Sequence, residues 1–94
     1  PPVLAAGTHR GVGYTLTAEP GPKRLRCRLA GAGLLRVLEH GREIARHAWS
    51  HADHWSDDDI PVTMSAPSLD IRIERTEKAV PRVEFIYLLA AEPV

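Results

Sequence analysis

Apolar and polar residues alternate one by one along most of this chain. The alternation is clear over residues 12–18, 24–29, 60–64 and 69–74, and segments rich in proline, glycine or serine separate these runs. One of these segments, residues 30–33, is expected to be a flexible turn. Successive side chains of a strand point to opposite faces of a sheet, so this pattern predicts strands with one buried face. Over residues 24–29 one face is apolar and the other consists of arginines.

Residues 34–39 and 42–48 flank His40-Gly41, a pair that predicts a hairpin turn. A two-residue turn of type I′ requires left-handed backbone at both positions, which glycine adopts freely and histidine tolerates. The segment is therefore expected to form a β-hairpin. Its register makes two cross-strand pairs, Val37 with Ile44 and Glu39 with Arg42.

Two neighbouring segments also carry signals for a helix. Residues 34–49 carry leucines and alanines at helical as well as strand spacing, but Gly41 would cost a helix about 1 kcal/mol relative to alanine. Farther along, Ser50 is followed three residues later by Asp53, a pattern typical of a helix N-terminus. We therefore expect a hairpin over residues 34–49 and one short helical turn near residues 51–55.

The last run, residues 83–89, is apolar on both faces after Glu84. Such a run is typical of a strand that is covered on both sides, by its own domain or by a partner. With it, about seven short strands follow one another at regular intervals, which predicts an all-β fold, a small antiparallel β-sandwich or barrel. Residues 12–94 are expected to form this single domain, and residues 1–11 an N-terminal arm.

Charge and cysteine content exclude several classes of protein. Twelve Lys and Arg residues balance twelve Asp and Glu residues, so no global field attracts nucleic acid or an anionic membrane. Cys27 is the only cysteine, which excludes an intramolecular disulfide and a cysteine-based zinc site. The sequence has neither an apolar run of about 20 residues nor a signal-peptide pattern. We expect a soluble protein that is intracellular or part of a virus particle.

Three histidines, His47, His51 and His54, are the candidate metal ligands, with Asp53 as a fourth. Imidazole nitrogens bind zinc or nickel if they converge, which here requires the segment to coil. The zincin pattern is not met, because Ala48 follows His47 where a glutamate is required. A solvated histidine-rich loop is the simpler interpretation, and we predict no cofactor.

The arginines of the second predicted strand form a basic row. They are Arg24, Arg26 and Arg28. Such a row binds phosphates or an acidic protein partner, but it binds them poorly when neighbouring carboxylates neutralise it. Asp70 and Glu74, on a later strand, are the expected neutralising residues, and residues 57–59 are expected to be a solvated acidic turn. This pairing argues against a nucleic-acid partner.

Apolar and aromatic residues supply candidates for a protein interface. Tryptophan is enriched among interface hot spots, and the arm and the last strand both carry apolar side chains that a partner could cover. The candidates are Val3, Leu4, Trp49, Trp55, Ile86 and Leu88.

The sequence contains no assembled catalytic motif. It lacks a nucleophile elbow, a phosphate loop and a dinucleotide fingerprint, and Cys27 alternates inward, as a core thiol does. We interpret the chain as a non-enzymatic structural or binding subunit that docks on a larger assembly through protein contacts or self-association, with no small-molecule substrate. Examples are a capsid-decorating or tail protein of a virus and an accessory domain of a larger protein. The alternatives are a metal-binding module built on the histidines and a binder of nucleic acid or an acidic partner through the arginine row.

Overall fold

A computed structural model describes residues 4–5 and 11–91, and the side chains of residues 13–51 and 53–91. The strands of this part are β1 (Leu4–Ala5), β2 (Gly11–Thr17), β3 (Gly21–Glu39), β4 (Arg42–Met64), β5 (Ser68–Glu74) and β6 (Arg82–Ala90). Every strand pair is antiparallel. The described part contains no helix that could span a membrane. The all-β prediction is confirmed.

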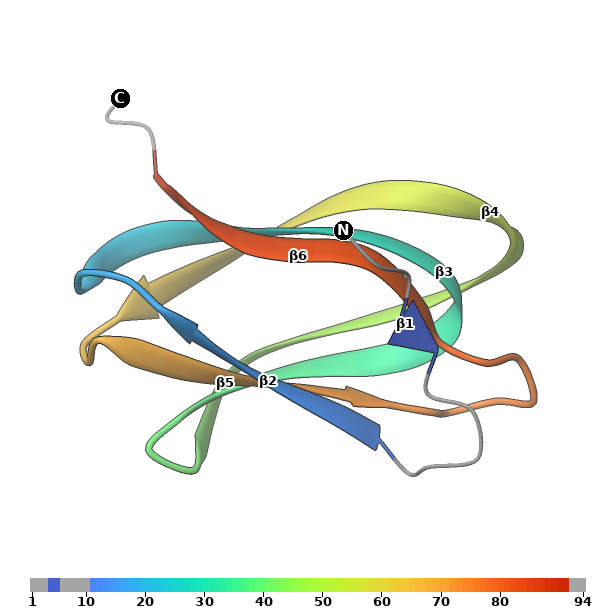
Figure 1. Cartoon of the computed structure of the whole chain (residues 1–94), viewed down its shortest axis with the longest axis horizontal. Helices are drawn as coiled ribbons and strands as arrows, with labels where there is room; N and C mark the ends of the chain where they lie inside the picture. Colours follow the sequence, from blue (N-terminus) through green and yellow to red (C-terminus); the bar gives the residue numbers. More distant parts are fainter. Residues whose placement is uncertain (1–3, 6–10, 92–94) are drawn as a thin grey trace.

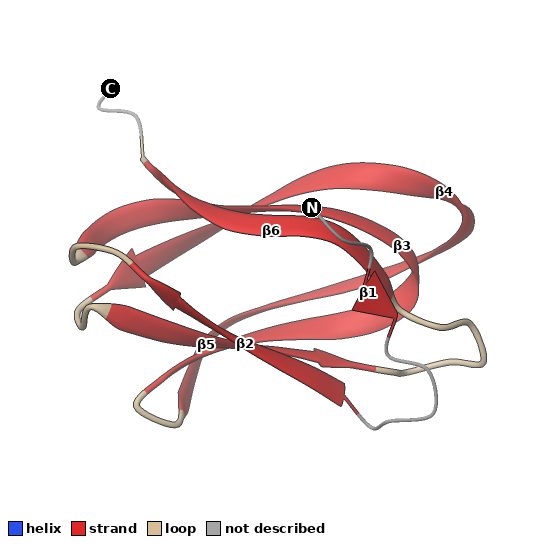
Figure 2. Ribbon diagram, in the orientation of Figure 1, coloured by secondary structure: helices blue, strands red, loops and turns tan. Residues whose placement is uncertain are grey.

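The strands form two layers that share β3 and β4 (Figures 1 and 2). The first half of β3 pairs with β6 and with the second half of β4, and β1 extends this layer beyond β6. The second half of β3 pairs with β5 and with the first half of β4, and β2 extends this layer beyond β5. One long hairpin therefore belongs to both layers of a β-sandwich.

The chain passes between the layers at a bend in β3. Leu29 pairs with Ser56 of β4, and Gly31 pairs with His51, so residues 52–55 lie opposite Ala30 alone. Gly31 has a φ of 75°, and a Cβ built there would overlap the carbonyl oxygen of Val80. Because both the backbone conformation and this close approach exclude a side chain, the bend depends on glycine.

Two elements predicted from the sequence are wrong at this bend. The glycine-rich residues 30–33 are not a turn but part of β3, since their backbone pairs with β4. Residues 51–55 form no helical turn, because ladder pairing on both sides keeps them inside β4. Four predicted strands therefore merge into two, and with β1, which lies in the predicted arm, the described part has six strands instead of about seven.

The hairpin predicted at His40-Gly41 is present. His40 has a φ of 52° and Gly41 a φ of 79°, and Glu39 pairs with Arg42 as predicted. The predicted pairing of Val37 with Ile44 is wrong. A register shift between Val37 and Leu38 brings Ala45 opposite Val37, which leaves Ile44 as the extra residue of a β-bulge.

The N-terminal arm predicted over residues 1–11 is partly described. Leu4 and Ala5 pair with Val83 and Arg82, so this segment is an edge strand of the first layer. Gly11 already belongs to β2. Val3 and the side chain of Leu4 lie outside the described part of the chain.

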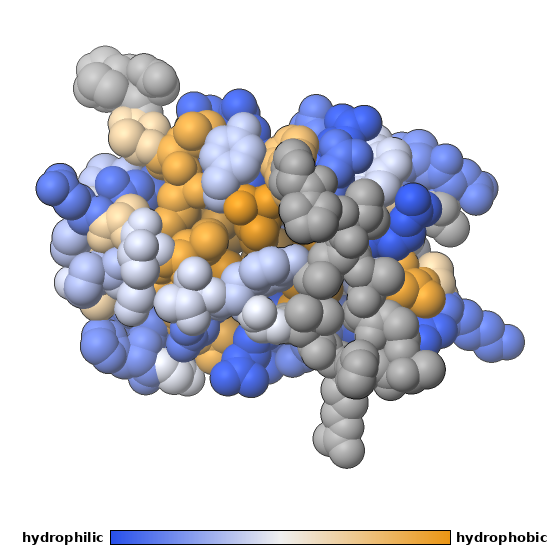
Figure 3. All heavy atoms as spheres, in the orientation of Figure 1, coloured by the Kyte–Doolittle hydropathy of each residue, from blue (hydrophilic) through white to orange (hydrophobic). Residues whose placement is uncertain are grey.

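The core lies between the layers and draws on the inner faces of β2 to β6. Its fully enclosed members include Leu25, Cys27, Leu29, Leu35, Val37, Leu69, Ile71 and Ile73. Leu16, Ile86 and Leu88 are half-buried and pack against it. Apolar surface is visible between the layers at their open side (Figure 3).

Glu39, the last residue of β3, fastens the turn between β4 and β5. Its Oε2 accepts hydrogen bonds from the backbone nitrogens of Ser65 (2.9 Å) and Ala66 (3.0 Å), and its Oε1 accepts one from the Ser65 hydroxyl. These hydrogen bonds hold the pKa of Glu39 below its usual value. The ionised carboxylate therefore stabilises the fold more than the protonated acid does.

We expect Gly31→Ala to destabilise the fold strongly. A left-handed alanine costs roughly 1–2 kcal/mol, and the overlap with Val80 adds about 1–3 kcal/mol. Urea unfolding measures the loss. Gly41→Ala is the matched control, because Gly41 also has a positive φ but nothing lies within 4 Å of a Cβ built there. Equal losses in the two variants would contradict the role assigned to the Val80 contact.

We expect the free energy of unfolding to fall in acid partly because of Glu39. A carboxyl group whose pKa is lowered by folding stabilises the protein above its unfolded pKa, near 4.5, and this contribution disappears as the pH falls through the folded value. Glu39→Gln should lower stability at pH 7 and flatten the loss below pH 4.5. Chemical unfolding at a series of pH values measures this. Glu19→Gln, at an exposed position, should leave the profile unchanged; an unchanged profile for Glu39→Gln would refute the assignment.

Candidate functional site: the outer face of β4, β3 and β6

Three neighbouring strands of the first layer present charged and aromatic side chains to the outside. We call this surface the binding face; its central residues are Arg24, Arg26, Arg28, Asp57, Asp59, Phe85 and Tyr87. In the ladder, Arg26 lies between Asp59 of β4 and Tyr87 of β6. Arg28 lies in the same way between Asp57 and Phe85. Each of these two arginines is therefore flanked by a carboxylate and an aromatic ring.

The arginines are fixed by ion pairs within the face. Arg26 holds Asp59 with two hydrogen bonds, Nε to Oδ1 at 2.8 Å and Nη2 to Oδ2 at 3.0 Å, and Arg24 Nη1 donates to Oδ2 at 3.2 Å. Arg28 Nη1 donates to Asp57 Oδ1 at 2.9 Å. The Arg26 guanidinium lowers the pKa of Asp59, while hydrogen bonds to Asp59 and Tyr87 raise the pKa of Arg26. Both groups therefore stay ionised at neutral pH.

These pairs correct two expectations. The partners of the arginine row are on β4 and β6, not at Asp70 or Glu74, which instead bond to Thr15 and Arg36. The acidic run is not a solvated turn but a strand segment, in which Asp57 and Asp59 point outward and Asp58 pairs with Cys27 and bonds to His47. Long antiparallel pairing of β3 with β4, invisible in local patterns, decides both points.

Aromatic rings occupy the remainder of the binding face. The ring centroids of Phe85 and Tyr87 are 5.4 Å apart, and Tyr87 is 40% exposed. Trp55, in the bulged part of β4, lies under the guanidinium groups of Arg82 and Arg28, at 4.8 and 5.9 Å from its ring centroid. The face thus carries planar apolar surfaces beside fixed hydrogen-bonding groups.

A shallow depression of about 400 Å³ lies in the middle of the face. Its lining is Arg26, Asp57, Asp59, Phe85 and Tyr87. Guanidinium groups donate hydrogen bonds and carboxylates accept them, while aromatic rings offer a flat apolar surface. The depression can therefore bind a molecule that has polar edges and an apolar side.

The structure brings two of the candidate metal ligands, His51 and His54, close to each other but does not unite all three histidines. His47 Nε2 donates to Asp58 Oδ2 at 2.8 Å, whereas His51 Nε2 donates to the Leu29 carbonyl oxygen at 3.1 Å, and the His54 ring lies 4.8 Å from that of His51. Residues four apart in a strand are about 13 Å apart, so the segment would have to coil to unite them. In the described part of the chain no three His, Cys, Asp or Glu side chains are grouped to hold a metal ion.

Two groups near these histidines resemble nucleophiles but are not activated. Ser56 Oγ lies 2.7 Å from His51 Nε2, yet that nitrogen needs its hydrogen for the Leu29 carbonyl and cannot accept the serine proton. Burial raises the pKa of the Cys27 thiol to about 12, which keeps it protonated. Neither group is poised to attack a substrate.

The candidate interface residues divide between core and surface. Trp49 is buried and donates from Nε1 to the Ala30 carbonyl oxygen at 2.9 Å, while Trp55 lies on the binding face. If side chains alternated strictly along β6, Ile86 and Leu88 would point to the face opposite that of Val83. A register shift between Arg28 and Leu29 makes a bulge at Glu84, so these two side chains pack inward.

The same bulge explains why Phe85 and Tyr87 do not stand out in the sequence. They turn outward once Glu84 is taken as the extra residue, because Val83 and Ile86 then share the inner face. The only sign of this outward aromatic pair in the sequence is that the run is apolar on both faces.

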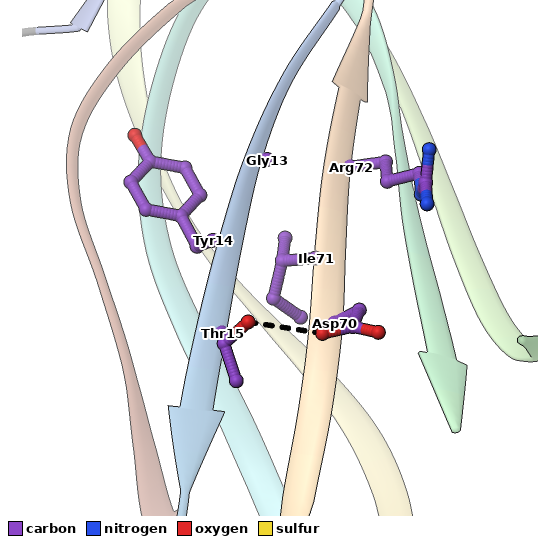
Figure 4. A pocket seen from close by; sticks show the side chains of 6 residues that line it. All are labelled: Gly13, Tyr14, Thr15, Asp70, Ile71 and Arg72. Carbon is purple, nitrogen blue, oxygen red and sulfur yellow. Dashed lines mark hydrogen bonds between the residues drawn. The ribbon is translucent and has the colours of Figure 1, made fainter. Parts of the chain in front are cut away.

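The second layer has a more polar hollow of about 340 Å³ over β2 and β5. Thr15 Oγ1 donates to Asp70 Oδ1 at 3.0 Å, and the Arg72 side chain is directed away from β2 (Figure 4). Gly13, which faces Arg72 in the ladder, leaves the space open. Its one aromatic lining residue, Tyr14, packs against the core, so this hollow offers no exposed ring for a ligand to stack on.

Comparison with known proteins identifies a fold and no family. No protein-family model matches the sequence, and no curated protein matches it. The structure is similar to the CBM36-1 domain of a multidomain xylanase from the hindgut metagenome of Trinervitermes trinervoides. The TM-score is 0.65 at 12% sequence identity, over 88% of this chain and 73% of that one.

A second solved structure has the same fold. It is the carbohydrate-binding module CBM36 in complex with calcium and xylotriose, with a TM-score of 0.63 at 16% identity, over 93% of this chain and 78% of that one. Identities this low establish the β-sandwich architecture. The chain therefore shares its fold with carbohydrate-binding modules.

Proposed function

We propose that this chain is a non-catalytic domain that binds carbohydrate on its binding face. The observation that carries the proposal is the depression in which the Arg26–Asp59 pair lies beside the rings of Phe85 and Tyr87. A fixed donor–acceptor pair next to exposed aromatic carbon is the combination that a sugar ring requires.

Sugar chemistry fits each part of this surface. A pyranose ring carries hydroxyl groups around its edge, each able to donate and accept, and it has an apolar C–H side. Charge-assisted hydrogen bonds are stronger and more directional than neutral ones, so Arg26 and Asp59 can orient the hydroxyl groups. Tyr87 is exposed enough for a ring to stack on it.

The fold comparison supports the same class of ligand. Both similar structures are carbohydrate-binding modules, and one of them holds xylotriose. That structure also holds calcium. Calcium requires six to eight oxygen ligands, but here Asp57 and Asp59 already pair with arginines, and the described residues offer no cluster of metal ligands. The proposal therefore includes no metal.

Docking on a protein partner is the second candidate function for the same face. Tyr, Trp and Arg are enriched at interface hot spots, and this face holds all three. In that case the chain would be an accessory domain of a larger protein or a subunit of an assembly such as a virus particle. Nucleic acid is a poorer partner, because Asp57, Asp59 and Glu84 pair with the three arginines of the row.

We expect soluble polysaccharides, xylan among them, to bind in the presence of EDTA. Tyr87→Ala should weaken binding of the best ligand about tenfold, or about 1.4 kcal/mol, because the stacking surface is lost. Isothermal titration calorimetry measures both values. Thr15→Ala, on the outer side of the second layer, is the matched control and should bind as the original chain does.

Three outcomes would contradict this proposal. They are failure to bind any glycan, loss of binding on addition of EDTA, and equal weakening in the Tyr87 and Thr15 variants. Sedimentation velocity on the same variants addresses the second candidate. Self-association or partner binding that Tyr87→Ala abolishes, without glycan binding, would identify the face as a protein-docking surface.

A further inference from the structure

The charges of the binding face do not cancel. Asp59 pairs with Arg24 and Arg26, and Arg28 pairs with Asp57 and also with Glu84, whose Oε1 lies 3.4 Å from Arg28 Nε. The remaining cation is Arg82, at the start of β6. It has no ion-pair partner within the described part of the chain, so the surplus positive charge of the face lies at its Trp55 end.

Arg82 is exposed, but its guanidinium group is held in place. The group lies 4.8 Å from the centroid of the Trp55 ring, and that of Arg28 lies 5.9 Å from the same centroid. Contact with an aromatic face stabilises a guanidinium by about 0.5–1 kcal/mol at an exposed site without using its N–H donors. Among the described residues, nothing therefore occupies the planar set of donors of Arg82, which can bind a ligand.

The surrounding charges restrict what that ligand can be. Asp57 and Glu84 lie beside Arg28, which shares the Trp55 ring with Arg82. A dense polyanion such as nucleic acid would meet these carboxylates wherever it extended beyond Arg82. A polysaccharide with mostly neutral hydroxyl groups and an isolated negative charge avoids this repulsion. Its one charge can pair with Arg82, and its hydroxyl groups can contact the arginines that are already paired.

We propose that Arg82, held against Trp55, is a subsite for the anionic substituent of an acidic polysaccharide. The inference rests on the proposed function and names its substrate class: sugar chains that carry isolated carboxylate or sulfate groups. A guanidinium group binds either group through two parallel N–H donors. The neutral part of the chain lies along Phe85 and Tyr87.

The test compares three oligosaccharides of similar length: xylotetraose, xylotriose carrying one glucuronate, and xylotetraose carrying one sulfate. At low salt the glucuronate or the sulfate form should bind at least fivefold more tightly than the neutral form. The tighter of the two identifies the anion that the subsite prefers. Higher salt should reduce the advantage, because screening weakens an exposed charge pair.

Variants then assign the effect to Arg82. Arg82→Gln should abolish the preference for the anionic sugar over xylotetraose, and Arg82→Lys should keep only part of that preference. Arg72→Gln, which removes the same charge from the exposed surface of the other layer, is the matched control and should keep the full preference.

The outcomes separate this inference from the proposed function. Xylotetraose binding without any preference for the anionic forms would overturn the Arg82 subsite and leave carbohydrate binding standing. An equal loss of preference in the Arg72 and Arg82 variants would also overturn it, since the effect would then come from net charge. If none of the three sugars binds, the Arg82 subsite is overturned, and the polysaccharide titration described above decides separately whether carbohydrate binding stands.

Discussion

The pairing of β3 with β4 is the constraint on which the rest of the molecule depends. These two strands share a ladder from Glu39–Arg42 at the tip to Gly21–Met64 at the far end, through both layers. β5 and β6 pair with different halves of β3, so each layer is built on the same strand. A change in the bend at Gly31 would therefore displace the two layers relative to each other and alter the core between them.

The binding face follows from that ladder. Alternation sends Leu25, Cys27 and Leu29 inward, so the arginines between them must point outward, and the register puts carboxylates opposite them. Exposed ion pairs contribute only about 0–1 kcal/mol each to stability. Their main effect here is geometric, because they fix the planes of guanidinium and carboxylate groups beside the rings of β6.

Local sequence patterns were sufficient for the class of fold and for one turn. Alternation identifies the strands, and His40-Gly41 identifies the hairpin, because the backbone angles of a type I′ turn restrict which residues fit it. Local patterns were insufficient where pairing with a distant segment determines the backbone conformation or the face to which a side chain points. The glycines at 31 and 33 read as a turn, although β4 and Val80 hold them inside a strand, and the bulge at Glu84 reverses the faces of β6.

The candidate site could be predicted only in part for the same reason. The arginine row and Trp55 are evident in the sequence, but their neighbours come from segments about 30 residues away, as in the pair of Arg28 with Asp57 at a separation of 29. Tyr87 and Phe85 become visible only when the register of β6 is known. The surplus charge at Arg82 becomes evident only when all ion pairs of the face are known, so no single sequence motif predicts it.

The position of the hairpin tip also has a consequence for the order of folding. Closing a loop between residues near in sequence costs the least chain entropy, and His40-Gly41 joins its strands with a loop of two residues. Pairing that starts there completes the second-layer half of the hairpin first and then advances through Gly31. The ladder between Arg24 and Pro61 closes only at the end of this process. On this path, the surface that we assign to ligand binding forms after the second-layer half of the hairpin.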